Sequence, residues 1–91
     1  MLKSYMVGYD LNNSNKDYSG LIAKIKEISG TWWHHLDSTW IIRSEKSAKE
    51  IRDLLSPFID ADDELLVAGL TGEAAWKGFN TRGSEWIKQH I

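Results

Sequence analysis

The sequence predicts an α+β domain in which two helices pack on one face of a four-stranded antiparallel sheet. Stretches rich in β-branched and aromatic residues alternate with stretches whose apolar residues recur every three and four positions, in the order β-α-β-β-α-β. Right-handed crossovers then favour the strand order 4-1-3-2, which is the ferredoxin-like arrangement. The 91 residues are expected to form a single domain, with a core at about residues 3–70 and a short helical C-terminal tail at 71–91.

Composition narrows the class of protein. Hydrophobic residues make up 42% of the chain and charged residues 26%, which is ordinary for a soluble globular protein. No apolar run approaches about 20 residues, so no membrane span is expected. The start of the chain lacks a signal-peptide layout, and a cytoplasmic location is expected. The absence of cysteine excludes disulfides and thiolate metal sites. A net charge of −2 gives no bulk attraction to nucleic acid, which would have to use a local patch.

The first strand is expected at about residues 3–11, with alternate apolar residues facing the core. A polar connection, Leu11 to Asn15, precedes a helix at about 17–29. Asp17 or Asn15 is placed to cap that helix, and Gly30 stands where a left-handed residue commonly ends one. The helix is expected to face the sheet with one stripe: Tyr18, Leu21, Ile22, Ile25 and Ile28.

The stretch from Gly30 to Arg43 is expected to form a hairpin closed by Asp37-Ser38. The pairs would be Leu36/Thr39, His35/Trp40, His34/Ile41, Trp33/Ile42 and Trp32/Arg43. One face would then carry Trp33, His35, Trp40 and Ile42, and the other Trp32, His34, Leu36, Thr39, Ile41 and Arg43. Both faces hold large apolar groups, so both need a cover. The domain's own helices cover one. A second subunit or a ligand is favoured for the other, with the C-terminal helices as the alternative.

A second helix is expected from Ala48 to about Leu55 or Ser56, because Ser47 and Glu50 have the spacing of a capping box and Pro57 ends regular helix. Its apolar stripe is expected to be Ala48, Ile51, Leu54, Leu55 and Phe58. The carboxylates at 60–63 lack the spacing of an EF-hand loop, which argues against Ca²⁺ there. A fourth strand follows at 64–70. The tail is expected to hold a short helical segment at 71–79 and a last helix at 85–90 capped by Ser84. Four of its residues are expected to fold back over the sheet: Trp76, Phe79, Trp86 and Ile87.

Asp10 is the sharpest candidate for chemistry, because it ends an apolar strand at the sheet edge where α/β proteins place ligands. In a two-fold dimer, two such carboxylates with waters and phosphate oxygens are ligands that Mg²⁺ takes. The alternative, favoured by position alone, is that Asp10 caps the following turn. His35 shares strand parity with Asp37 and is a candidate base or metal ligand, with packing against Trp40 as the favoured alternative.

The tryptophan cluster has two interpretations. Bases stack on aromatic rings, so Trp33 and Trp40 with Arg43 are candidate contacts to RNA or DNA. Tryptophan also anchors protein interfaces, and a dimer interface or the core is the favoured use. The basic residues that follow the hairpin, Arg43, Lys46, Lys49 and Arg52, are offset in charge by Glu45, Glu50 and Asp53.

The element order and the stretch Tyr5-Met6-Val7-Gly8-Tyr9-Asp10-Leu11 resemble the small CRISPR-associated adaptation nucleases, the partners of the CRISPR integrase, and related toxin-like and SinR-like bacterial proteins. The resemblance covers about residues 3–70 by element order and Tyr9-Asp10 by motif. It implies a ferredoxin-like fold, a symmetric homodimer, and Mg²⁺ held by Asp10 at the dimer interface. The family commonly adds a short strand that crosses to the partner, whereas residues 71–91 look helical here.

These observations lead to a first hypothesis, a metal-dependent endonuclease. Asp10 would hold Mg²⁺, a bound water would attack phosphorus, and His35 would assist proton transfer. The second hypothesis is a non-catalytic nucleic-acid-binding module, and the third is a protein-interaction partner without nucleic acid.

Overall fold

The computed structural model describes residues 1–12 and 17–91, so the proposed cap Asn15 lies outside the described residues. The described residues form an α+β structure with a four-stranded antiparallel sheet and three α-helices. The elements are β1 (Lys3–Asp10), α1 (Ser19–Ile28), β2 (Trp32–Leu36), β3 (Thr39–Ser44), α2 (Ala48–Leu55), the short 3₁₀ helix η1 (Ser56–Phe58), β4 (Glu64–Gly69) and α3 (Thr81–His90).

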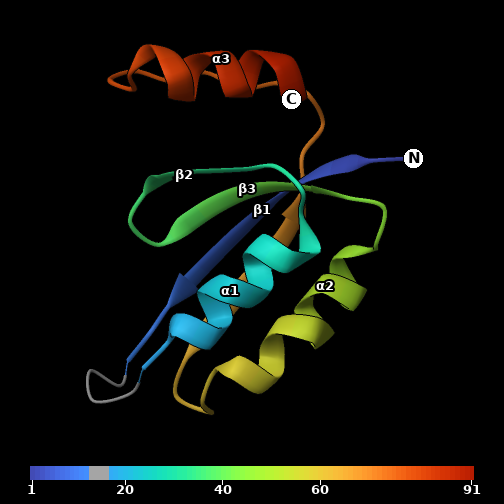
Figure 1. Cartoon of the computed structure of the whole chain (residues 1–91), viewed down its shortest axis with the longest axis vertical. Helices are drawn as coiled ribbons and strands as arrows, with labels where there is room; N and C mark the ends of the chain where they lie inside the picture. Colours follow the sequence, from blue (N-terminus) through green and yellow to red (C-terminus); the bar gives the residue numbers. More distant parts are fainter. Residues whose placement is uncertain (13–16) are drawn as a thin grey trace.

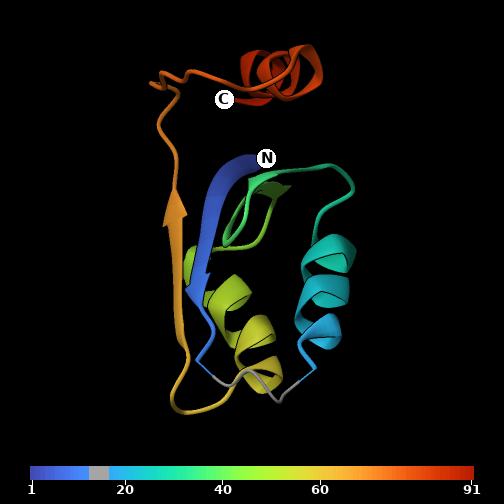
Figure 2. The same cartoon turned by 90° about the vertical axis from the view of Figure 1, so that its left-hand side faces the viewer.

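The strand order in the sheet is β2-β3-β1-β4, and every neighbouring pair is antiparallel. Counted from the other edge, this is the expected order 4-1-3-2, and it is compatible with a ferredoxin-like fold. Helices α1 and α2 cover one face of the sheet and α3 lies on the opposite face, which gives three layers (Figures 1 and 2).

The core under α1 and α2 follows the predicted apolar stripes. Its fully buried members come from β1, β3 and both helices: Val7, Leu21, Ile25, Trp40, Ile42, Ile51 and Leu55. The capping box that starts α2 is confirmed, since Ser47 Oγ accepts from the backbone N–H of Glu50 and the Glu50 carboxylate accepts from that of Ser47. At the start of α1, the Asp17 carboxylate accepts a hydrogen bond of 2.9 Å from the backbone N–H of Ser19.

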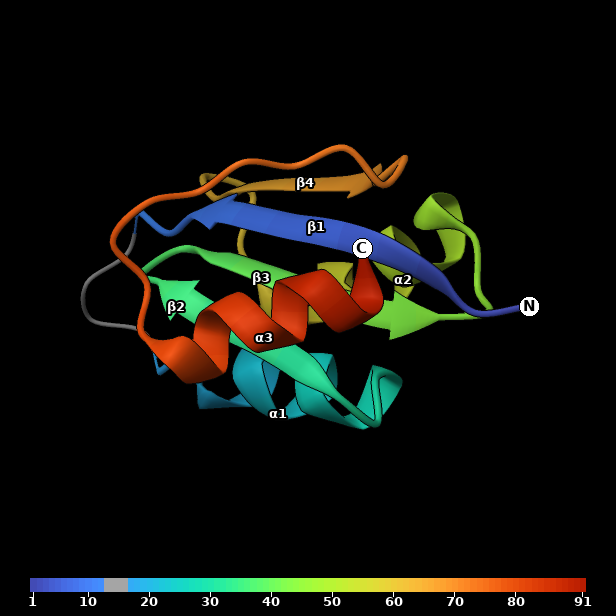
Figure 3. The same cartoon turned by 90° about the horizontal axis from the view of Figure 1, so that it is seen from above.

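A second core lies between the sheet and the C-terminal part of the chain. Trp33, Ile41 and Ile87 are buried there, and other residues pack against them: Leu70, Trp76, Phe79, Trp86 and Ile91. The four tail residues that were expected to fold back do so. α3 lies over β2 and β3, and the segment before it passes on the β4 side (Figure 3). The chain therefore covers this face itself, and the apolar hairpin does not require a second subunit.

The predicted hairpin register is wrong beyond its closing pair. Leu36 faces Thr39 as expected, but Trp33 faces Ile41 and Trp32 faces Ile42. Two residues, His34 and His35, therefore stand opposite one, and this is a β-bulge, which inserts a residue and reverses the facing of those beyond it.

The bulge changes which residues share a face. Trp33 packs with Ile41 and Ile87 in the second core, whereas Trp40 and Ile42 belong to the first. The prediction that Trp33 and Trp40 share a face is therefore wrong.

The prediction of a helix at 71–79 is wrong. This segment is irregular, and Gly72 and Gly78 have φ angles of 99° and 92°. Such angles are unfavourable for residues with a side chain and incompatible with a right-handed helix. Among the described residues only these two glycines have positive φ, so Gly30 does not end α1 in the predicted left-handed conformation.

The last helix also begins earlier than predicted, at Thr81. Asn80 caps it, because its side-chain oxygen accepts a 2.9 Å hydrogen bond from the backbone N–H of Gly83. Ser84, the predicted cap, lies inside the helix.

Candidate functional site

Asp10 lies exposed at the end of β1, directly opposite Glu64 of β4. Directly opposed residues on antiparallel strands place their Cβ atoms about 5 Å apart on one face of the sheet. The two residues line an open pocket together with Gly8, Tyr9, Leu65 and Leu66. Two adjacent carboxylates repel each other unless a cation or a proton lies between them. No group of three potential metal-ligating side chains was found in the described part of the chain.

His35 does not join Asp10. Its ring lies on the α3 side of the sheet, 5.2 Å from the ring of Trp33 between centroids, and lines a different pocket. The two residues proposed for catalysis therefore do not share a pocket. The expected packing of His35 on Trp40 is also wrong, because the bulge places His34 there instead. The His34 and Trp40 rings stack with centroids 3.8 Å apart at 11°.

The two tryptophans proposed as contacts are buried in the chain. Trp33 is 2% exposed and its Nε1 donates to the carbonyl oxygen of Gly83 over 3.1 Å. Trp40 is 1% exposed and its Nε1 donates to the Tyr9 hydroxyl over 3.0 Å. Both side chains therefore serve the two cores, and neither presents a ring to solvent.

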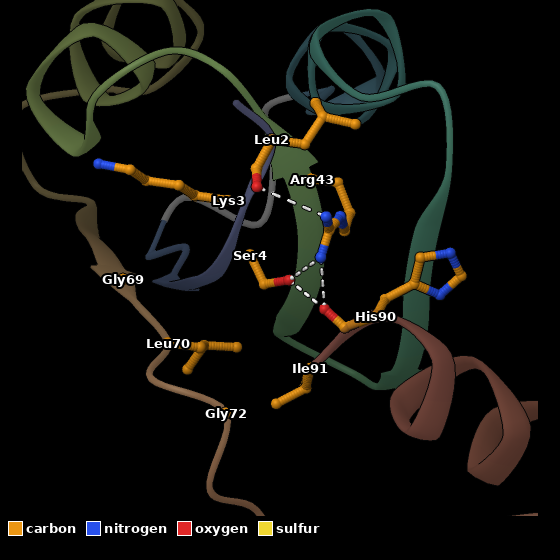
Figure 4. Close-up of a pocket in the computed structure, with 9 residues that line it drawn as sticks. All are labelled: Leu2, Lys3, Ser4, Arg43, Gly69, Leu70, Gly72, His90 and Ile91. Carbon is orange, nitrogen blue, oxygen red and sulfur yellow. Dashed lines mark hydrogen bonds between the residues drawn. The ribbon is translucent and has the colours of Figure 1, made fainter.

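Arg43 is half-buried at the junction of β1, β3 and the end of α3 (Figure 4). Its Nη1 donates to Ser4 Oγ over 3.0 Å and to the carbonyl oxygen of His90 over 2.7 Å. The Ser4 hydroxyl donates to the same carbonyl. Arg43 thus stabilises the C-terminal end of α3, where exposed carbonyls attract a cation.

A pocket that the sequence did not reveal lies between the α1–β2 connection, β2 and α3. Its volume is about 260 Å³, and its six lining residues are Gly30, Thr31, Trp32, His35, Arg82 and Trp86. We call it the Trp32–Arg82 pocket. The Trp86 indole N–H donates to Thr31 Oγ1 over 2.8 Å, which fastens α3 to the connection before β2.

The side chains around this pocket combine flat rings with positive charge. Trp32 is 39% exposed, and the ammonium of Lys26 lies 5.4 Å from its ring centroid. Among the described residues, no side-chain hydrogen bond or ion pair occupies the Arg82 guanidinium or the His35 ring nitrogens. An exposed indole and unengaged donors suit a flat molecule that carries negative charge.

The residues that line this pocket come from two distant parts of the sequence, so no single stretch predicts it. Residues 30–35 and 82–86 approach only because α3 folds back over β2. Arg82 lies between the helical segments that the sequence predicts at 71–79 and 85–90, whereas the structure has it in the first turn of α3. Trp32 was expected beside Arg43, whereas the bulge turns it toward α1 and Lys26.

No protein-family model matches the sequence, and neither the curated proteins nor the solved structures yielded a match. In the part of the chain that the structure describes, we find no helix with the length and apolar character needed to cross a bilayer.

Proposed function

We propose that this protein binds unpaired nucleotides of RNA or DNA in the Trp32–Arg82 pocket, as a non-catalytic module. One observation supports this most: an exposed indole, an unengaged guanidinium and an imidazole surround the same open pocket. A base would stack on Trp32, and Arg82 would bind the adjoining phosphate.

The size of the pocket fits this proposal. Its volume of about 260 Å³ is below the roughly 300–1,000 Å³ typical of drug-sized ligands, which favours one base with its phosphate at the rim. The pocket is built from an edge strand and a helix rather than from a groove that follows a duplex. Unpaired nucleotides are accordingly the expected class of ligand, because their bases are free to stack.

Charge sets the expected strength of binding. The net charge of −2 provides no general attraction, and the basic groups near the pocket are Arg82, Lys26 and His35. Few phosphates would be neutralised, so binding should release only about one or two counterions. The logarithm of the affinity should therefore fall with the logarithm of the salt concentration at a shallow slope of about −1 to −2.

Fluorescence anisotropy with labelled single-stranded RNA, single-stranded DNA and duplex DNA tests the proposal. We expect Trp32→Ala to lower single-strand affinity about 5- to 150-fold, the range that loss of one stacked base gives. Arg82→Ala should lower it about 10-fold. Arg52→Ala is the matched control, because Arg52 is exposed on α2 and pairs with Asp53.

Two outcomes would count against this function. One is the absence of single-strand binding by the wild-type protein at low salt. The other is an equal loss of affinity in Arg82→Ala and Arg52→Ala, which would indicate nonspecific attraction. Circular dichroism of each variant checks that the fold is kept.

A second candidate function, metal-dependent phosphodiester cleavage, is supported by the opposed positions of Asp10 and Glu64. Two carboxylates, with remaining positions left to water and phosphate oxygens, fit the donor set of Mg²⁺. The bound ion would neutralise phosphate charge and lower the pKa of a water. In this proposal Asp10 and Glu64 would hold the ion at this end of the sheet. His35 has no part, because it lines another pocket.

Cleavage assays with Mg²⁺, Mn²⁺ or EDTA separate the two candidates. Metal-dependent cutting that disappears in both Asp10→Asn and Glu64→Gln supports the phosphodiesterase. Cutting that persists in both variants excludes it. The homodimer and the ferredoxin-like relationship implied by the resemblance remain part of this second proposal. Light scattering at tens of micromolar, a range at which weak dimers form, measures whether the protein is a dimer.

A further inference from the structure

A separate apolar cavity lies in the second core, between the sheet and the irregular segment 71–79. Its volume is about 180 Å³. None of its lining residues lines the Trp32–Arg82 pocket. We infer that this cavity is a binding site for a small uncharged aromatic molecule of one ring.

The lining defines the chemistry of the ligand. Aromatic rings of Trp33, Trp76 and Phe79 form part of the wall, together with aliphatic side chains from the sheet and α3. Among the described residues that line the cavity, none has a charged side chain and Thr39 is the only one with a hydroxyl. Both lining indoles already donate their N–H groups, Trp33 to Gly83 and Trp76 to Ser84. A charged or strongly polar ligand would therefore lose its hydration without gaining partners.

The volume defines the size of the ligand. An apolar cavity of about 150 Å³ is large enough to accept benzene. The cavity here is slightly larger, at about 180 Å³, which admits one ring with a small substituent. Leu36, Ala74 and Ala75 line it and are exposed, so it reaches the surface on their side.

Fixed contacts keep the cavity from collapsing. The segment that covers it is fastened at its start by the Leu70 N–H, which donates to the Ser4 carbonyl over 2.9 Å. The Trp76 indole N–H holds its middle to Ser84 Oγ over 3.0 Å. Near its end, Phe79 meets Trp33 edge to face with centroids 4.9 Å apart. A ligand would enter without breaking these contacts, so little ordering opposes binding.

The chain supplies an internal probe and its own control. The sequence has two methionines: Met6 lines the cavity, and Met1 is 97% exposed. With ¹³C-methyl methionine, titration with toluene should shift the Met6 signal saturably and leave the Met1 signal unchanged. Half-saturation at about 1 mM or below is expected for so small a ligand. Benzoate, which has a similar shape and a charge, should not shift Met6.

A cavity-filling variant completes the test. Ala75→Leu adds three carbons at an exposed lining position and should abolish the saturable Met6 shift. Ala61→Leu, in the exposed turn before β4, should leave it unchanged. The inference is overturned if toluene gives no saturable shift at Met6, if benzoate binds as well as toluene, or if Ala75→Leu binds with unchanged half-saturation. Since the oligonucleotide assay probes other residues, either proposal can fail while the other holds.

Discussion

The guanidinium of Arg43 donates a 2.7 Å hydrogen bond to the carbonyl oxygen of His90, so a side chain of β3 holds the last turn of α3. Ser4 of β1 binds the same carbonyl. The helix that covers the second face of the sheet is thereby tied to the two central strands at one point (Figure 4).

Replacing Arg43 with Met should loosen α3 while keeping much of the apolar stem. We expect a loss of about 1–3 kcal/mol in the free energy of unfolding, because a charged donor is removed from a half-buried carbonyl. Hydrogen exchange should accelerate along α3 more than along α1. Arg52→Met is the control on an exposed arginine, and equal protection of α3 in both variants would contradict the role assigned to Arg43.

Ser29 is fully buried where α1 meets the hairpin, and its hydroxyl connects two backbones. It donates to the Thr31 carbonyl and accepts from the Arg43 N–H over 3.1 Å. Ser29→Ala leaves both backbone groups without this partner, so we expect a destabilisation of about 1–3 kcal/mol in urea unfolding. The exposed Ser38→Ala should change stability by less than about 0.5 kcal/mol. A similarly small effect in Ser29→Ala would show that water replaces the hydroxyl.

Gly83 and His35 should be energetically coupled. A Cβ added at Gly83 would lie 3.2 Å from three atoms of the His35 ring, so the ring must move. In a His35→Ala background, Gly83→Ala should stabilise α3 by about 0.5–1 kcal/mol through helix propensity. With His35 present, this gain should be reduced or reversed. A double-mutant cycle measures the coupling, and additive effects within about 0.3 kcal/mol would contradict the contact.

Stability near α2 should depend on pH through Glu50. The Glu50 carboxylate accepts a hydrogen bond from the backbone N–H of Ser47. This bond, and to a smaller extent the Ser47 side chain, lowers the pKa of Glu50 below its usual value. A lowered folded-state pKa contributes stability that is present above the unfolded-state pKa and is lost as pH falls through the folded-state pKa.

Glu50→Gln isolates this charge, because glutamine keeps the shape and accepts the same hydrogen bond. The variant should be less stable than the wild type at about pH 7, and the difference should shrink on acidification to about pH 3. Urea unfolding at both values measures it. A difference that does not change with pH would show that the charge of Glu50 contributes nothing to folding.

Local patterns predicted the elements that local interactions determine. The apolar stripes of both packed helices, the Ser47–Glu50 capping box and the hairpin closing pair Leu36–Thr39 are found where periodicity and turn chemistry place them. Each depends on residues within a few positions of one another, so a single stretch of sequence contains the information.

The bulge could not be predicted, because an extra residue in a strand changes neither its composition nor its turn. The register depends on distant contacts. The Trp33 indole N–H donates to the carbonyl oxygen of Gly83, 50 residues further along, and the Trp40 indole N–H donates to the Tyr9 hydroxyl. The segment 71–79 is a similar case. Its Ala74-Ala75-Trp76 run favours a helix, but tertiary contacts such as that of Trp76 with Ser84 determine its conformation.

The sequence predicted single residues of the two candidate sites but not the neighbours of those residues. Position at a strand end was enough to single out Asp10, but its neighbour Glu64 became apparent only from the β1–β4 pairing. His35 was chosen for its chemistry, and its surroundings depend on the first turn of α3, which begins four residues earlier than the sequence predicted.

The covering of the sheet by α3 has a consequence for how the chain is made. All four strands precede α3 in the sequence, so during synthesis the sheet and its two packed helices exist before their second cover. In that interval the apolar face around Trp33 and Ile41 is open to water and to other nascent chains. A chain that is truncated before residue 81 should therefore be prone to aggregation, although residues 1–80 already contain every strand that the structure describes.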